Sequence, residues 1–171
     1  MVQALRADNK EVPGYLNGLA LTYDNPNIKE VAFAMFCYWT GEMELGAIRG
    51  VVNTEAGHYS GREVTRVWYD SKALPLENLI QRAQEVKCAD AVYVPANQSV
   101  PTQSRLKIQT FKESGYHKAS KSDQKKQIQG FNFKGVSLSP YQLTKFNSFY
   151  RRDRNRAASF LSSNQKKVLF P

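Results

Sequence analysis

Strand-like and helix-like segments alternate between residues 31 and 97, and their order constrains the fold more than any other feature of the sequence. The first strand-like segment is a continuous apolar run, as expected of a strand buried on both faces. The second and third alternate with period two around the turn Ser60-Gly61, which predicts a hairpin. The four strands are predicted at residues 31–37, 51–59, 63–69 and 91–94.

Two helices separate these strands in the sequence. The first is predicted at residues 39–48, with Gly50 as its stop signal. The second runs from Pro75 to about residue 87, because proline is favoured in the first turn of a helix. Its apolar stripe consists of Leu76, Leu79, Ile80, Ala83 and Val86. The resulting order, β-α-β-β-α-β, predicts an α+β fold of the ferredoxin-like kind over residues 31–97.

The segments on either side of this core have a different character. Residues 1–30 are rich in turn formers and are predicted to be irregular. Residues 96–137 are rich in Gln, Ser, Lys and Asn, which predicts a long loop or arm. One helix is expected to start at Ser139-Pro140 and a second to cover residues 155–169. We expect both helices to pack on the sheet or on each other, with partner binding as the alternative.

The net charge of +9 belongs to the second part of the chain. Residues 1–97 contain 9 Lys and Arg against 12 Asp and Glu, whereas residues 98–171 contain 15 against 3. Residues 98–171 are therefore predicted to be a basic C-terminal extension, which is either simply solvated or attracts nucleic acid or an acidic partner. The basic residues expected at such a contact are Lys107, Lys112, Lys125, Lys126, Arg151, Arg152, Arg154 and Arg156. The aromatic residues expected to stack on bases, if they are not core residues, are Phe131, Phe133, Phe146 and Phe149.

Several classes of protein are disfavoured by composition. No run of about 18 apolar residues suggests a spanning helix, so no membrane partner is expected. The chain as given begins without an apolar signal segment, which predicts a cytoplasmic protein. Two cysteines, Cys37 and Cys88, are too few for a disulfide scaffold and form no CxxC pair, so no metal site is expected. They are sufficient for one redox couple.

Cys37 is the residue with the clearest chemical potential. It lies at the end of the first predicted strand and directly before a helix, whose N-terminus carries partial positive charge. A cysteine in this position is expected to have a lowered pKa and to be a better nucleophile. Tyr38 and Trp39 follow it at a turn, where they can form an apolar pocket. The alternative is that Cys37 is a small core residue.

The segment Phe36-Cys37-Tyr38-Trp39-Thr40-Gly41-Glu42 resembles the signature of the peptide methionine sulfoxide reductase A family, which reads Gly-Cys-Phe-Trp, two residues and Glu. Cys37, Trp39 and Glu42 match, while Tyr38 replaces Phe and Phe36 replaces Gly. Residues 63–70 are similar to the family's strand after its Gly-His-Ala-Glu motif. The resemblance covers residues 31–87, and the family's downstream Asp and Tyr have no recognisable counterpart after Cys88.

The resemblance implies a reductase that repairs oxidised methionine in proteins or peptides and has no bound cofactor. Cys37 would attack the sulfoxide sulfur, and Glu63 would protonate the sulfoxide oxygen. Tyr38 and Trp39 would hold the methyl group, and Tyr59 or His58 would replace a pocket tyrosine of the family. Cys88 is the candidate resolving cysteine, with thioredoxin or another thiol as reductant. The alternatives are an exposed Glu63, a buried and unreactive Cys88, and a redox-inactive structural module.

Overall fold

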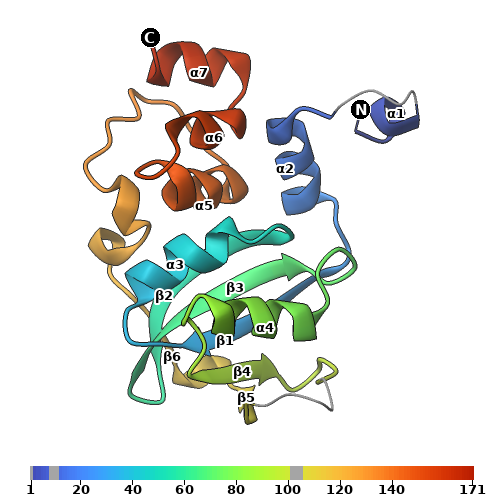
Figure 1. The fold of residues 1–171 in the computed structure, drawn as a ribbon, viewed down its shortest axis with the longest axis vertical. Helices are drawn as coiled ribbons and strands as arrows, with labels where there is room; N and C mark the ends of the chain where they lie inside the picture. The colour runs from blue at the N-terminus through green and yellow to red at the C-terminus, as the bar shows by residue number, and fades with distance from the viewer. Residues whose placement is uncertain (1, 8–11, 101–105) are drawn as a thin grey trace.

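The computed structural model describes residues 2–7, 12–100 and 106–171, which form a mixed α+β structure around one curled sheet (Figure 1). The strands of this sheet follow the order β5-β4-β1-β3-β2-β6. All neighbouring strands are antiparallel except β4 and β5, which are parallel. The predicted α+β class is therefore confirmed. The strands are β1 (Ile28–Ala34), β2 (Val51–Tyr59), β3 (Arg62–Asp70), β4 (Ala91–Pro95), β5 (Ile108–Phe111) and β6 (Tyr116–Lys118).

Two helices, α3 (Tyr38–Ala47) and α4 (Leu76–Glu85), cover one face of the sheet, as Figure 1 shows. Alternate residues of the strands point into the space between these layers, because successive side chains of a strand face opposite sides. Phe33, Leu45 and Leu79 are completely buried there. Further members of this main core are Val31, Met35, Val51, Val67, Tyr69, Ile80, Ala83 and Val92.

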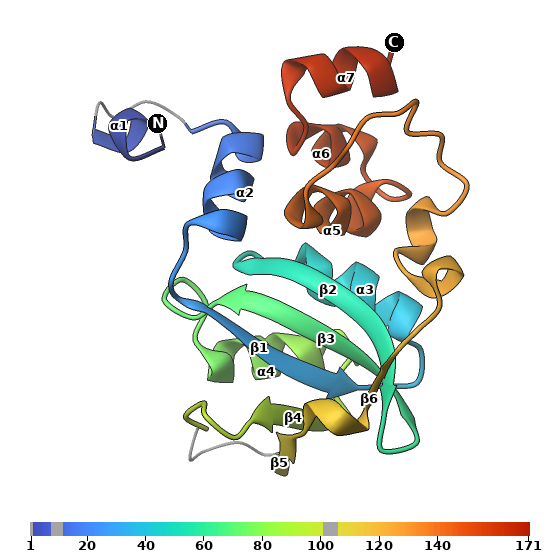
Figure 2. The ribbon, with the colours of Figure 1, turned by 180° about the vertical axis from the view of Figure 1, so that it is seen from behind.

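The opposite face of the sheet is covered in part by the segment that carries β5 and β6, which crosses it in Figure 2. A second, smaller core forms here around Tyr59, Tyr93 and Phe111. The ring centroids of Tyr59 and Tyr93 are 4.8 Å apart, and those of Tyr59 and Phe111 are 4.9 Å apart. These aromatic contacts attach the segment to the sheet.

The prediction of an irregular N-terminal segment is wrong where the structure describes it. Residues 2–7 form α1 (Val2–Ala7) and residues 14–23 form α2 (Gly14–Tyr23), while residues 8–11 lie outside the described part. Gly14 and Gly18 are contact positions within the helix rather than turns. A Cβ atom on Gly18 would lie 2.3 Å from the ring of Tyr141, and one on Gly14 would lie 2.9 Å from the carbonyl oxygen of Ser159.

The predicted loop over residues 96–137 also contains regular structure. Its β5 extends the sheet beside β4, and its β6 pairs with β2 at the other edge. These strands have four and three residues, which is too short to produce a visible period in the sequence. Single 3₁₀ turns connect the remainder. They are η1 (Glu113–Gly115), η2 (Lys121–Asp123) and η3 (Lys126–Ile128).

The first predicted C-terminal helix is confirmed as α5 (Pro140–Phe149). The Ser139 side chain accepts a hydrogen bond from the backbone N–H of Gln142, and the Gln142 side chain accepts one from the backbone of Ser139, which is a capping box. The second helix divides into α6 (Arg154–Ser159) and α7 (Ser163–Leu169), because Ser162 caps a new start. Among the described helices, none is long and apolar enough to cross a bilayer.

Helix α5 packs against α3, and α6 and α7 stack on α5 above the sheet (Figure 1). The contact between these C-terminal helices and the preceding loop is aromatic: Phe131 lies 5.2 Å from Phe146 and 5.0 Å from Tyr150, measured between ring centroids. Phe146 is completely buried and Phe149 nearly so. The expectation that these helices pack on one another is confirmed, and neither aromatic side chain is free to stack on a base.

A buried lysine joins α5 to the end of α3. Lys145 is 3% exposed, and its Nζ donates hydrogen bonds to the carbonyl oxygens of Gly46 at 2.7 Å and Ile48 at 2.9 Å. These carbonyls belong to the C-terminal end of α3, which attracts cations. Burial, together with the positive charge of Arg156, lowers the pKa of Lys145 to about 7. The ammonium group is therefore easier to deprotonate in the folded protein than in the unfolded chain.

Because the pKa of Lys145 is lowered in the folded protein, we expect the deprotonation of this residue to raise the free energy of unfolding as the pH increases. Between about pH 7 and the ordinary lysine pKa, the unfolded chain binds one more proton than the folded chain, so stability increases with pH by up to about 1.4 kcal/mol per unit. We expect Lys145→Met to remove this slope. Urea unfolding of both proteins at pH 6, 7, 8 and 9 measures it, since all other titrating groups are shared. Parallel stability curves for the two proteins would contradict the prediction.

Candidate functional site

Cys37 lies at the junction between β1 and α3, where the sequence predicts it. It is the N-cap residue of α3, has extended backbone geometry, and is half-buried. Close packing fixes this junction, because a Cβ atom on Gly41 would lie 2.1 Å from the sulfur of Met35 and 2.2 Å from Oγ1 of Thr65. Only glycine allows α3 to approach the strands this closely. The thiol is thus held at a helix N-terminus, close to free backbone N–H groups.

Glu63 is brought to the same helix end. Its Oε2 accepts a hydrogen bond of 2.8 Å from the backbone N–H of Tyr38, the residue after Cys37. Its backbone carbonyl accepts another, of 3.2 Å, from the N–H of Met35. Within the described part of the chain, no donor is bonded to the other carboxyl oxygen, Oε1. The side chain is half-buried, so one oxygen is anchored and the other is available.

The aromatic residues after the thiol differ in environment. Tyr38 is 8% exposed and packs with Ala56 and Ala119. Trp39 is half-buried beside it, and Lys126 Nζ lies 4.4 Å from the centroid of the indole. Phe36, which precedes Cys37, is 96% exposed. Aromatic residues therefore precede and follow Cys37 in the sequence.

Tyr59 is not part of this group, although the resemblance assigned it to the substrate pocket. It faces the second core on the opposite side of the sheet, where its hydroxyl donates to the carbonyl oxygen of Thr110 and accepts from the N–H of Lys112. The preceding residue, His58, faces the side of Cys37. It pairs directly with Glu63 in the β2–β3 ladder, and its ring lies edge-on to Tyr38 with the centroids 5.4 Å apart.

The segment from Ala119 to Ile128 packs beside Tyr38 and Trp39. No sequence pattern predicted that this segment belongs to the site. Gln124 binds both backbone groups of Ala56, at 3.0 Å to the N–H and 2.8 Å to the carbonyl. The negative charge of Asp123 acts on Tyr38: burial is the main cause of the raised pKa of Tyr38, and Asp123 and Glu63 add to it. The contacts of Gln124 with Ala56 join residues 68 positions apart, so only the folded chain shows them.

An ion pair between Lys125 and the buried carboxylate of Glu42 holds this segment over α3. Glu42 is completely buried, and its two oxygens accept from Lys125, one from the backbone N–H at 2.6 Å and one from Nζ. The Nζ of Lys125 also bonds to the carbonyl and the hydroxyl of Thr54. Lys125 is therefore a structural residue. The expectation that it contacts a nucleic acid or an acidic partner is wrong, because its ammonium group is occupied.

Cys88 is 1% exposed and belongs to the main core, where its thiol donates to the carbonyl of Val86. Burial, with smaller effects of Glu44, Asp90 and Cys37, raises its pKa to about 11. The β1–β4 ladder places the two cysteines at the same end of the sheet. Ala34 pairs with Ala91, so Cys37 follows one partner by three residues and Cys88 precedes the other by three. Both thiols are free.

No group of three or more His, Cys, Asp and Glu side chains within the described ranges is arranged to hold a metal ion. Compared with known proteins, the chain matches no protein-family model and no curated protein. The geometry around Cys37 is therefore the basis for any functional assignment.

The two cysteines are expected to differ strongly toward alkylation. At pH 7, a pKa of about 11 leaves about one Cys88 thiolate in ten thousand, and the core excludes the reagent. Iodoacetamide should therefore modify Cys37 in the native protein and Cys88 only after unfolding, as read by peptide mass spectrometry. Cys37→Ser serves as the control and should remain unmodified under native conditions. Equal labelling of both residues in the folded protein would contradict the prediction.

Proposed function

We propose that the protein is a thiol oxidoreductase that reduces methionine sulfoxide in peptides or proteins. The observation that supports this most directly is the hydrogen bond from the Tyr38 N–H to Oε2 of Glu63, because it sets a carboxyl group beside the nucleophile. The reaction requires both groups. A thiolate must attack the sulfur, and the oxygen must be protonated so that it does not have to leave the sulfur as oxide.

In the proposed first step, the Cys37 sulfur forms a bond to the sulfoxide sulfur while Glu63 gives its proton to the sulfoxide oxygen. The new sulfur–sulfur bond and the sulfur–oxygen bond of the substrate then break as the hydroxyl group passes to the Cys37 sulfur, and Glu63 is left as a carboxylate. The products are methionine and a sulfenic acid on Cys37, so the substrate is reduced by two electrons and the cysteine is oxidised by two. The available Oε1 of Glu63 is the atom that would carry the proton. Tyr38 and Trp39 would contact the methyl group.

The sulfenic acid must then be reduced. We propose that Cys88 attacks the oxidised sulfur of Cys37, which releases water and forms a disulfide. The position of both residues at one end of the β1–β4 ladder supports this step. Because Cys88 is buried, the residues between α4 and β4 would have to move. A thioredoxin-like dithiol would restore the two thiols by exchange, which suits a reducing compartment such as the cytoplasm.

The strand arrangement is compatible with this function. In the central four strands, the order β4-β1-β3-β2 with antiparallel neighbours and two helices on one face supports a ferredoxin-like core. In this arrangement the end of β1 and the start of β3 are neighbours. The acid would therefore come from the strand beside β1, and the nucleophile from the short junction between β1 and α3, which favours a defined geometry.

The proposal predicts that the purified protein converts a peptide methionine sulfoxide to methionine with dithiothreitol as reductant. Cys37→Ser should abolish the reaction. Glu63→Gln should lower kcat/KM by about 10²–10⁴-fold, because the amide accepts the same hydrogen bond from Tyr38 but delivers no proton. Product is measured by chromatography of the peptide.

Glu55→Gln is the matched control for this experiment. Glu55 lies on β2 and binds Tyr116 and Lys118 away from Cys37, so its substitution should leave the rate unchanged. Absence of methionine with the unchanged protein, or full turnover by Cys37→Ser, would refute the proposed function.

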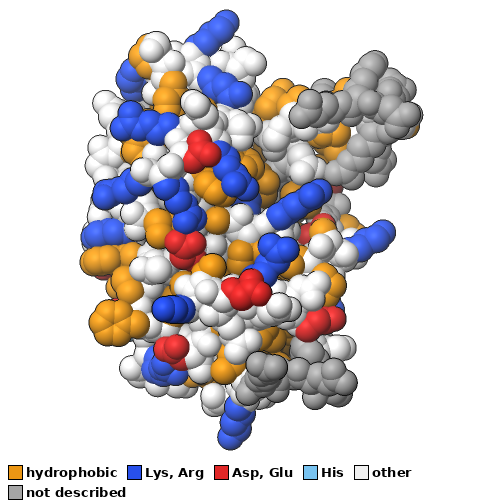
Figure 3. Space-filling model, in the orientation of Figure 1, with side chains coloured by type: hydrophobic (Ala, Val, Ile, Leu, Met, Phe, Trp, Pro, Cys, Tyr) orange, Lys and Arg blue, Asp and Glu red, His pale blue; other side chains and the backbone are white. Residues whose placement is uncertain are grey.

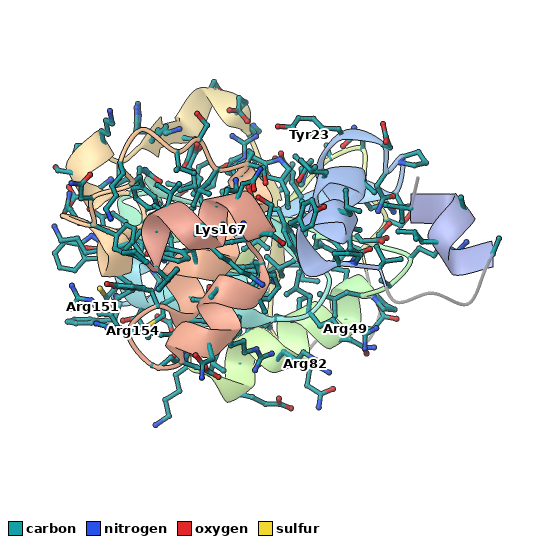
Figure 4. The ribbon with its side chains drawn as sticks, turned by 90° about the horizontal axis from the view of Figure 1, so that it is seen from above. Tyr23, Arg49, Arg82, Arg151, Arg154 and Lys167 are labelled. Carbon is teal, nitrogen blue, oxygen red and sulfur yellow. The ribbon has the colours of Figure 1, made fainter. Side chains whose placement is uncertain are left out.

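A binding role for the C-terminal helices is the second candidate. Arg154 and Arg156 are exposed, their guanidinium groups lie 5.2 Å from the ring of Tyr150 and 4.1 Å from that of Phe149, and neither forms an ion pair within the described residues. Arg152, in contrast, is paired with Glu44. Figure 3 shows Lys and Arg side chains spread over α5–α7 with few acidic neighbours. In Figure 4, Arg151 and Arg154 both lie at the same edge of these helices.

This candidate predicts affinity for a labelled 30-nucleotide single-stranded DNA that falls at least about tenfold between 50 and 200 mM salt, because phosphate contacts release counterions. Arg154→Gln with Arg156→Gln should weaken binding. Arg82→Gln on α4, which lies apart from Arg151 and Arg154 in Figure 4, should not. A flat salt response in fluorescence anisotropy would exclude the candidate.

A further inference from the structure

We propose that a pocket at the turn of the β2–β3 hairpin, which is separated from Cys37 by Tyr38 and His58, binds an acidic side chain of the peptide substrate. This inference rests on the proposed reductase function and specifies its substrate class. The pocket has a volume of about 460 Å³ and lies between the β2–β3 hairpin and the segment that carries η1 and β6. Its polar side chains are those of His58, Ser60, Lys112, Ser114 and His117.

The pocket walls are held in place by the second core. The Tyr59 hydroxyl accepts a hydrogen bond of 3.0 Å from the backbone N–H of Lys112 and donates one to Thr110, which attaches the loop to the hairpin. Gly115 packs against the same ring, since a Cβ atom there would lie 3.1 Å from it. His58 and His117 are direct partners in the β2–β6 ladder, so both imidazoles stand on one face of the sheet.

The chemistry of this pocket is that of an anion site. Its lining offers one ammonium group, two imidazoles and two hydroxyls, and none of the described lining residues is acidic. Glu113 is adjacent to Lys112 in sequence, but its carboxylate pairs with Arg66 on the other side of the loop at 2.8 Å. An entering carboxylate would therefore meet hydrogen-bond donors and a positive charge from the lining residues. The carboxyl group of Glu63, the ladder partner of His58, lies outside the lining and is bound to the N–H of Tyr38.

His58 connects this pocket with the thiol. His58 lines the pocket, and its ring lies edge-on to Tyr38, the residue that follows Cys37. A peptide that binds with its sulfoxide at Cys37 and continues along Tyr38 and His58 would bring a neighbouring side chain to this pocket. We infer that sulfoxides with a nearby Asp or Glu are the preferred substrates.

Direct binding tests this inference without relying on turnover. A fluorescein-labelled peptide with Asp two residues from methionine sulfoxide, and a second with Asn in its place, are titrated against Cys37→Ser by anisotropy. The Asp peptide should bind about tenfold more tightly, as expected for one charge-assisted contact. Adding Lys112→Gln should remove this preference. Adding Lys72→Gln, which removes an exposed charge at the opposite end of β3, should preserve it.

The result separates the pocket from the reductase function. The proposed role of the pocket is overturned if the two peptides bind with equal affinity or if neither binds. It is also overturned if Lys72→Gln removes the preference as much as Lys112→Gln does. These outcomes count against the pocket even where sulfoxide reduction occurs. A preference that depends on Lys112 supports the pocket even where the unchanged protein forms no methionine, which instead refutes the proposed reaction.

Discussion

The antiparallel pairing of β1 with β3 is the interaction on which the rest of the structure depends. Its register, with Ala34 opposite Val64, sets Glu63 beside the chain that leads to Cys37. Side chains alternate along a strand, so a slip of one residue would turn Glu63 to the opposite face and expose Val67. The completely buried residues Phe33 and Val67 oppose such a slip. The core therefore determines where the acidic group stands relative to the thiol.

Two lysines, Lys125 and Lys145, bind α3 and thereby fix the position of the C-terminal part of the chain. Lys125 binds Glu42 within α3, and Lys145 binds the carbonyls at the end of the same helix. The middle and the C-terminal end of α3 are thereby joined to segments more than 80 residues later in the sequence. A charge in a protein interior is costly unless it is hydrogen-bonded, so these contacts specify one arrangement of the C-terminal helices over α3. The helix that follows Cys37 is therefore held at two points, by Lys125 at Glu42 and by Lys145 at its last carbonyl groups.

Much of the secondary structure could be predicted because its signals are local. The alternation in residues 51–59 and 63–69, the turn at Ser60-Gly61 and the cap at Ser139 each act within a few residues. The predictions failed where the same residue type serves two structural roles, such as glycine, which occurs in turns and also at close contacts between helices. Gly14 and Gly18 belong to the N-terminal segment that its turn formers predict to be irregular, but they allow α2 to pack closely against other helices. Likewise, β5 and β6 are strands only because the edges of an existing sheet provide hydrogen-bond partners.

The sequence by itself determined the position of Cys37 between a strand and a helix, the hairpin that carries Glu63, and the basic character of residues 98–171. Only the tertiary structure decided that Glu63 meets the N–H of Tyr38, that Tyr59 faces away while His58 faces the site, and that Lys125 is consumed by an internal ion pair. The reason is physical. Turn and cap preferences act over a few neighbouring residues. Which face of a strand becomes buried, and which group pairs with a charged side chain, depends on the packing of segments that are distant in the sequence.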